Sequence, residues 1–216
     1  MAGRPRLPRG LVRGPGRRPR RRRHQPPGRG PNRWARAAPG PAVVQRPEAA
    51  VEELRRSVQD LDAVGAYFGS DARTFLDDAE IAPVYSACVE LDLPLFVHAA
   101  MPGIDGPPGD RRLERWIGQA VLGYPFEDTV ATTTFLSATS STGNPGLDVC
   151  LTHGGGATAM FWGRISAFAR TARGPFTDDR LREHMHRLWF DYHVHSPASA
   201  DLLRQLARHP VHLILG

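Results

Sequence analysis

A histidine followed by three glycines is the first feature of this sequence that could carry chemistry. The short, mostly apolar run 147–152 leads into His153, and residues 154–156 are all glycine. Such a run bounded by glycines predicts a buried strand. Glycines permit positive φ and close approach of a ligand. A histidine at this point can bind a metal or transfer a proton near neutral pH. His153 is therefore the first candidate for a metal ligand or a proton-transfer group.

A second histidine lies in the same kind of position. Residues 93–98 form another short apolar run, which ends at His98. Runs of this kind alternate with helical spacing along the chain, which predicts a parallel α/β fold with about five βα units. In such folds the ligand site lies beyond the carboxyl ends of the strands. The expected strands are 64–69, 93–98, 147–153, 189–194 and 211–215, and the expected helices are 47–61, 81–91, 113–122, 127–138, 161–169, 178–188 and 196–207.

Composition limits the class of protein. With 216 residues and 41% apolar content the chain can bury one core, which favours a single folded domain. The sequence contains no apolar run of the roughly 20 residues that are needed to cross a bilayer. It also has no apolar h-region of a secretory signal. We expect Cys88 and Cys150 to be buried free thiols and the protein to be cytoplasmic.

The first 46 residues differ from the remainder. They carry 14 of the 28 basic residues and no acid (net +14), whereas residues 47–216 have a net charge of −8. We expect segment 1–46, rich in Arg, Pro and Gly, to be disordered. All basic residues are arginine, as in a GC-rich coding sequence, where a wrong frame or start codon yields such composition. We interpret the segment as an artefact or non-functional extension; a linker and a nucleic-acid-binding arm are alternatives.

Several motifs in the remaining chain resemble one family. The motifs are residues 93–98, 123–129, 152–156 with Gly163-Arg164, 189–191 and 213–216. Taken in order, they make residues 47–216 similar to the amidohydrolase-related (amidohydrolase 2) superfamily. The most similar branch contains aminocarboxymuconate-semialdehyde decarboxylase and resorcylate decarboxylases.

The resemblance implies a fold and a set of site residues. The fold is a distorted (β/α)₈ TIM-like barrel with one divalent metal, zinc or manganese. The resemblance implies that His98 is a metal ligand, that His153 is the catalytic base, and that Arg164 holds a substrate carboxylate. Trp116 matches an aromatic residue that lines the substrate pocket. It also implies a homodimer for the full-length family.

The chain departs from the family pattern at both ends. A His-x-His motif expected on the first strand is absent, and the sequence stops at Gly216, before the expected Thr-Asp-x-Pro. We therefore expect an incomplete barrel in a truncated chain. One divalent metal is still expected from the resemblance, but the truncated chain can lack it because ligands are missing.

Other polar residues have simpler interpretations. The pair His193 and His195 would share one face of a strand and is an alternative metal site. In the helical segment 184–186, we expect His184 and His186 to be solvated. Glu127 and Asp128 are expected to be first-turn acids favoured by the helix dipole.

The function that we expect is a metal-dependent decarboxylase or hydrolase acting on a small, aromatic or cyclic carboxylate. One alternative is a catalytically inactive remnant of the same family. A third hypothesis is a basic-tailed nucleic-acid-binding protein, although the segment 1–46 lacks interleaved aromatic residues, so we do not expect a nucleic-acid partner.

Overall fold

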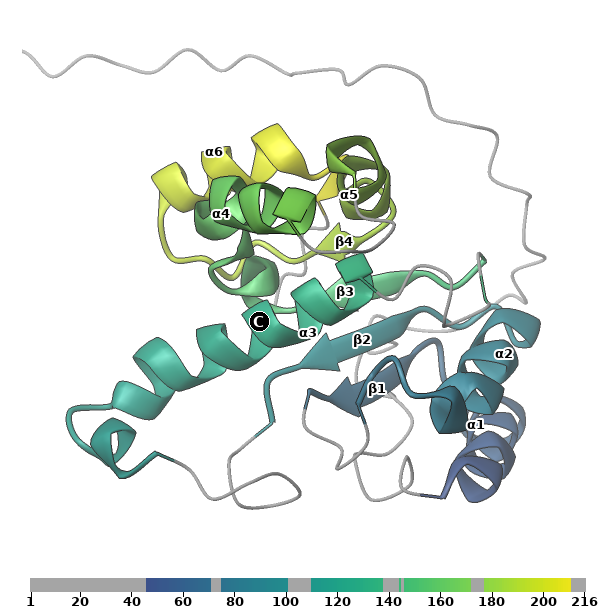
Figure 1. The fold of residues 1–216 in the computed structure, drawn as a ribbon. Helices are drawn as coiled ribbons and strands as arrows, with labels where there is room; N and C mark the ends of the chain where they lie inside the picture. Colours follow the sequence, from purple (N-terminus) through teal and green to yellow (C-terminus); the bar gives the residue numbers. More distant parts are fainter. Residues whose placement is uncertain are drawn as a thin grey trace, which may run out of the picture. The chain divides into compact units, whose positions relative to one another are not determined.

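Short strands alternate with helices in the computed structural model, which describes residues 46–70, 75–100, 110–137, 144, 146–171 and 177–210. All of them belong to one compact unit, Asn32–Gly216. The strands are β1 (Ala66–Gly69), β2 (Leu95–His98), β3 (Val149–Leu151), β4 (Trp189–Phe190) and β5 (His209–Pro210). The α-helices are α1 (Pro47–Leu61), α2 (Ala82–Glu90), α3 (Tyr124–Ser137), α4 (Thr158–Thr171), α5 (Asp178–Met185) and α6 (Pro197–Leu206), shown in Figure 1.

Prolines begin two of these helices where the sequence predicts. Helix α1 begins at Pro47, and α6 begins at Pro197 after Ser196, whose hydroxyl accepts a hydrogen bond from the Ser199 N–H. Proline suits the first helical position because its missing N–H would have no partner there. Both helices then bury one apolar side, and α1 packs on α2 while α6 packs on α4.

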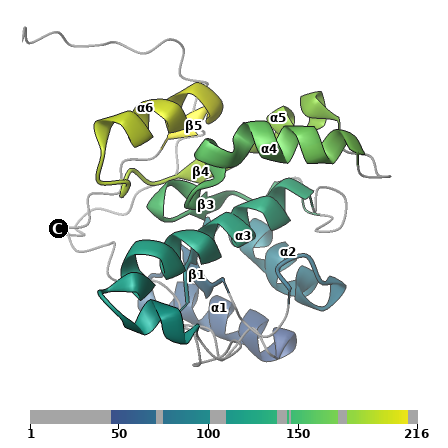
Figure 2. The ribbon, with the colours of Figure 1, turned by 60° about the vertical axis from the view of Figure 1, so that its left-hand side comes forward.

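All five strands are parallel, and their order in the sheet is their order in the chain. This sequential order is that of a β/α barrel, whereas a doubly wound sheet reverses its order at a switch point. The helices pack on one another in two groups, α1 on α2 and α4 on both α5 and α6. In Figures 1 and 2, α3 runs between these two groups of helices.

The two faces of the sheet have different surroundings. One row of residues paired across neighbouring strands belongs to the buried core, together with apolar side chains of the helices: Phe68, Val97, Leu151 and Phe190. The neighbouring row, which includes Phe96, is partly exposed in β1, β2 and β4. Side chains alternate along a strand, so His98 lies on the same face as Phe96, opposite the helix-covered core.

Several expected boundaries were wrong. The third and fourth strands end early, at Leu151 and Phe190, and a 3₁₀ turn η6 (His153–Gly155) follows the third. The expected helix 113–122 is a 3₁₀ turn η4 (Arg111–Glu114) and a π-helix η5 (Gln119–Gly123) that continues into α3. The expected strand 211–215 and segment 1–45 lie outside the described residues.

The expectations for the thiols agree with the structure. Cys88 and Cys150 are free and buried, and burial raises the pKa of each thiol to about 12. They therefore remain protonated at neutral pH and pack as small apolar side chains. Among the described residues, none of the helices has the length and apolar character needed to span a membrane.

The buried row through β3 provides a test of the core. Leu151 is fully buried, so Leu151→Ala should lower the free energy of unfolding by about 2–5 kcal/mol, through lost apolar burial and a new cavity. Urea denaturation followed by circular dichroism measures the change. Leu202→Ala, on the exposed side of α6, is the matched control and should cost less than about 1 kcal/mol. Equal losses for the two variants would contradict this assignment of the core.

Candidate active site at the carboxyl ends of β2 and β3

A buried carboxylate holds His153. Asp128 lies on α3, which packs against β2, β3 and η6, and its side chain is 0% exposed. Its Oδ2 is 2.6 Å from His153 Nδ1, and its Oδ1 accepts a hydrogen bond from the Thr152 hydroxyl at 3.2 Å. The carboxylate therefore selects the tautomer with a proton on Nδ1, and Nε2 is left for chemistry.

The same contact shifts the protonation of the imidazole. The hydrogen bond to Asp128 raises the pKa of His153 above its ordinary value, partly offset by burial, while the charges of Asp128 and Asp191 raise it further. A half-buried imidazole with a raised pKa can be protonated near neutral pH. It can then act as an acid as well as a base.

The three glycines are required by the turn that places His153. His153 has φ 47°, and the three residues that follow also have positive φ. A Cβ at Gly155 would lie 2.6 Å from the Phe190 ring, and one at Gly156 would collide with the Pro125 carbonyl. The Asp191 Oδ1 accepts hydrogen bonds from the Gly154 N–H at 3.0 Å and the His193 N–H at 3.1 Å. Asp191 thus ties the turn after β3 to the loop after β4.

His98 lies beside His153, as the topology predicts for the ends of adjacent strands. Their ring centroids are 4.9 Å apart, and those of His153 and His193 are 5.5 Å apart. His98 Nδ1 is 2.7 Å from the Ala99 carbonyl oxygen, an arrangement in which Nδ1–H donates and Nε2 can coordinate a metal. The position of His98 is therefore compatible with a role as one metal ligand. Within the described ranges, however, no set of three or more His, Cys, Asp or Glu side chains is placed to hold a metal.

The two expected substrate residues lie at the surface. Trp116 follows η4 and is 82% exposed. Arg164 is an exposed residue of α4, and its guanidinium lies 4.7 Å from the centroid of the Phe168 ring. Neither placement tests a contact with substrate, so both roles stay predictions.

Sequence reasoning missed the two buried aspartates. Asp128 was expected to be a first-turn acid, but it lies inside the continuous helix η5–α3 and points at His153 rather than at a helix end. Glu127 accepts a hydrogen bond from the Ser70 hydroxyl. Neither aspartate has a local sequence spacing that marks a functional site. The signal that could have found them is that both lie within motifs that resemble the family, residues 123–129 and 189–191.

The other histidines also differ from expectation. His184 was expected to be solvated, which is wrong: it is buried, and its Nδ1 lies 2.9 Å from the Leu136 carbonyl oxygen. His193 and His195 lie in the loop after β4 rather than on a strand, although their ring centroids are 4.3 Å apart. Strand alternation therefore does not place them, and the described residues around them do not form a three-ligand metal centre.

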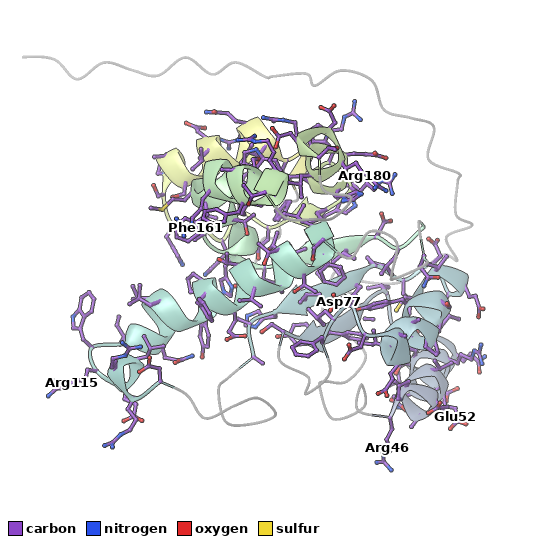
Figure 3. All side chains as sticks on the ribbon, in the orientation of Figure 1. Arg46, Glu52, Asp77, Arg115, Phe161 and Arg180 are labelled. Carbon is purple, nitrogen blue, oxygen red and sulfur yellow. The ribbon has the colours of Figure 1, made fainter. Side chains whose placement is uncertain are left out.

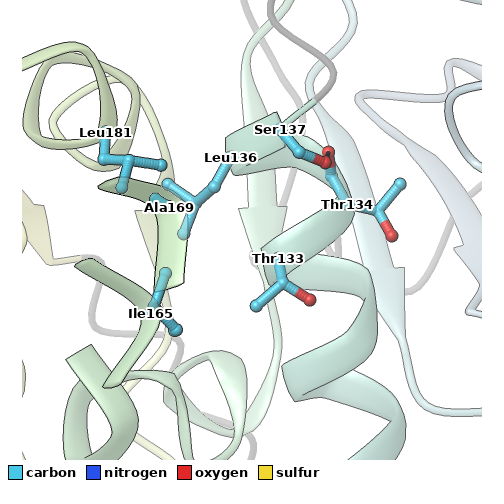
Figure 4. A pocket seen from close by; sticks show the side chains of 7 residues that line it. All are labelled: Thr133, Thr134, Leu136, Ser137, Ile165, Ala169 and Leu181. Atoms are coloured by element: carbon cyan, nitrogen blue, oxygen red, sulfur yellow. Dashed lines mark hydrogen bonds between the residues drawn. The ribbon is translucent and has the colours of Figure 1, made fainter. Parts of the chain in front are cut away.

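A separate cavity of about 290 Å³ lies among the outer helices. In Figure 4, Thr133 and Leu136 of α3 lie across it from Ile165 of α4 and Leu181 of α5. The Thr133 and Ser137 hydroxyls donate to carbonyls of their own helix. None of the histidines described above lines this cavity, so it is distinct from the candidate active site.

Comparison with known proteins decides the family. The Amidohydro_2 family, described as amidohydrolase, matches residues 31–208. The chain belongs to this family. The α/β fold of an incomplete TIM-like barrel is thereby confirmed, with an open five-stranded sheet in the described residues.

The relatives of this chain have several activities. The chain is 29% identical over 173 residues to 2-amino-3-carboxymuconate-6-semialdehyde decarboxylase of Dictyostelium discoideum, covering 77% of this chain and 46% of that protein. It is 28% identical over 169 residues to 2-keto-4-carboxy-3-hexenedioate hydratase of Sphingobium sp. (strain NBRC 103272 / SYK-6), covering 74% and 46%. The chain thus spans about half the length of these curated relatives.

Solved structures share the fold. That of 5-carboxyvanillate decarboxylase from Sphingomonas paucimobilis has a TM-score of 0.62 at 22% identity, covering 79% of this chain and 54% of that one. The same enzyme from Novosphingobium aromaticivorans DSM 12444, complexed with manganese, has a TM-score of 0.62 at 19% identity, covering 79% and 52%.

Removing the buried carboxylate should change the titration of His153. We expect Asp128→Asn to lower the pKa of His153, because the main interaction that favours the imidazolium is lost while burial remains. Proton NMR titration of the histidine rings measures the shift. Asp201→Asn, at an exposed carboxylate paired with Arg204, is the control and should leave the titration unchanged. An unaltered His153 pKa in Asp128→Asn would contradict the pairing.

The raised pKa also predicts how stability depends on pH. An unfolded histidine titrates at about 6.5, so the protonated pair contributes its full stabilisation below that pH. The contribution is lost as the pH rises through the higher folded-state pKa. His153→Gln should therefore cost more unfolding free energy near pH 6 than near pH 9, as measured by urea denaturation at each pH. A loss that does not vary with pH would be inconsistent with a raised pKa.

The crowded turn gives a steric prediction. Gly156→Ala should destabilise the fold by more than about 1 kcal/mol, because the residue has positive φ and no space for a Cβ. Gly163→Ala, on α4 with open space around its Cα, should be neutral or stabilising. Thermal denaturation compares the two. Equal melting temperatures for the two variants would show that the turn tolerates a side chain.

Proposed function

We propose that this member of the amidohydrolase family acts on a small aromatic or cyclic carboxylate and removes CO₂ from it without oxidation. The observation that carries the proposal is the His153–Asp128 pair, a buried carboxylate bonded at 2.6 Å to an imidazole. The pair lies at the carboxyl ends of parallel strands, where β/α barrels bind substrates. The similarity to decarboxylases supports this choice of reaction over hydrolysis.

The chemistry required of this chain is a proton transfer. In decarboxylation the bond between the ring carbon and the carboxylate breaks, its electron pair stays on the ring carbon, and CO₂ leaves. Protonated His153 then delivers a proton to that carbon from Nε2, and Asp128 stabilises the imidazolium and keeps the ring oriented. Arg164 would orient a substrate carboxylate through paired hydrogen bonds, and Trp116 would line the pocket.

A divalent metal is part of the proposal. His98 would supply one ligand through Nε2, and the other ligands would come from outside the described residues. Zinc is the first candidate and manganese the second, since a manganese-containing structure shares the fold. A bound metal would polarise a substrate oxygen. We propose a cytoplasmic location, in keeping with two free thiols.

Hydration of a carboxylate substrate is the second candidate reaction. It is favoured by the similarity to a hydratase over nearly the same share of the chain. The same His153 would then remove a proton from water rather than protonate carbon. The two reactions differ in product, since only decarboxylation releases CO₂.

Turnover of defined carboxylates tests the proposal. The full chain, with Zn²⁺ or Mn²⁺, is incubated with 2,6-dihydroxybenzoate or 5-carboxyvanillate, each carrying ¹³C in the carboxyl group ortho to a phenolic hydroxyl, and ¹³CO₂ is measured. We expect release by the wild type and a loss of about 10²–10⁴-fold in His153→Gln, the range for removal of a general acid–base. His186→Gln, at a histidine that the mechanism does not use, is the control and should retain activity.

Each other result has a defined meaning. Hydration of 2-keto-4-carboxy-3-hexenedioate, the substrate in the name of one relative, without ¹³CO₂ release from the two benzoates would replace decarboxylation by hydration. Equal activity of His153→Gln and the wild type would exclude His153 as the proton donor. If the wild type neither turns over substrate nor binds metal by elemental analysis, the inactive remnant is the correct interpretation.

A further inference from the structure

His193 lies at the edge of the candidate active site, and the proposed proton transfer does not use it. It is in the loop after β4, and its ring centroid is 5.5 Å from that of His153. Among the described residues, its side chain makes ring contacts with His153 and His195 and no hydrogen bond. The residue is exposed. Both ring nitrogens are therefore available to a ligand that occupies the site.

The backbone of this loop is held in place although the ring is exposed. One oxygen, Oδ1 of Asp191, accepts hydrogen bonds from the His193 N–H at 3.1 Å and from the Gly154 N–H at 3.0 Å. A single carboxylate thus joins the loop that carries His193 to the turn that carries His153. Ordering a side chain on binding costs affinity, and a residue whose backbone is already fixed has less order to gain.

The two residues that follow also restrict His193. The Val194 side chain packs over Gly154 so closely that a Cβ there would lie 2.4 Å from the Val194 Cγ1. His195 has φ 52°, an uncommon conformation for a residue other than glycine. Its ring lies edge-to-face on that of His193, with centroids 4.3 Å and planes 74° apart, an arrangement that aromatic rings favour. The His193 imidazole is therefore limited in the orientations that it can adopt.

The side chains that contact the His153 imidazole, among the described residues, are three rings and a carboxylate: His98, Tyr124, His193 and Asp128. Figure 3 shows the labelled arginines away from the sheet, at helix ends or on outer sides: Arg46, Arg115 and Arg180. A substrate oxygen that is taken out of water among these rings needs a hydrogen-bond donor, since leaving it without one costs free energy. His193 can supply the donor, because an imidazole carries an N–H in both of its protonation states.

We propose that His193 is a substrate-binding residue, which donates a hydrogen bond to a second oxygen substituent on the ring of the substrate. This inference rests on the proposed function, because it takes an aromatic or cyclic carboxylate as the ligand. Arg164 then holds the carboxylate, His153 transfers the proton, and His193 recognises a hydroxyl or a second carboxylate. The site should therefore prefer ring carboxylates that carry a further oxygen over those that do not.

Equilibrium binding of matched ligands tests the proposal. The full chain is titrated with benzoate and with 2-, 3- and 4-hydroxybenzoate, and the histidine ring signals are followed by proton NMR. We expect the wild type to bind at least one hydroxybenzoate about 3–10-fold more tightly than benzoate, the range for one hydrogen bond. His193→Leu should lose this preference, with the Kd of benzoate changed by less than about twofold. His186→Leu, at a histidine outside the candidate site, is the matched control and should keep the preference.

A conservative variant separates hydrogen bonding from ring packing. His193→Gln keeps an N–H donor, so it should restore at least part of the preference that His193→Leu loses. The bond from the residue 193 N–H to Asp191 does not need the imidazole, so we expect both variants to fold, which circular dichroism checks. If His193→Leu does not fold, His193→Ala replaces it and must show the same loss.

Four results would overturn the proposal. They are a wild type without a preference for any hydroxybenzoate, a folded His193→Leu that keeps the preference, a His193→Gln that binds no better than His193→Leu, and a lower zinc content of His193→Leu by elemental analysis. The last result would make His193 a metal ligand. Binding is measured without turnover, so a preference that depends on His193 supports the proposal even if no ¹³CO₂ is released and the proposed decarboxylation fails.

Discussion

The buried hydrogen bond between Asp128 and His153 is the interaction on which the candidate site depends. A fully buried carboxylate is costly unless it is paired, and here Thr152 and His153 share its two oxygens. The bond joins α3 to the turn after β3, so it is both a packing contact and a chemical one. It fixes which nitrogen of the imidazole faces the site, and it makes the protonated ring more stable.

The glycine turn and Asp191 make this geometry possible. The residues after His153 pass so close to Phe190 and Pro125 that side chains would collide there. Asp191 then anchors the turn through Gly154 and the next loop through His193. The rings of His98, His153 and His193 are brought together by the ends of three neighbouring strands. Parallel pairing in sequential order is what makes those ends adjacent.

The sequence by itself determined the alternation of strands and helices, the family, and the position of His98 and His153 at the ends of neighbouring strands. Short apolar runs ending in histidine are local features, and parallel topology brings their ends together. The sequence did not reveal Asp128, Asp191 or the burial of His184, because their partners are 25, 37 and 48 residues away in the chain. Only tertiary packing places a helix carboxylate beneath a strand-end imidazole. The π-helix η5 also depends on that packing, since no local spacing predicts one extra residue in a turn.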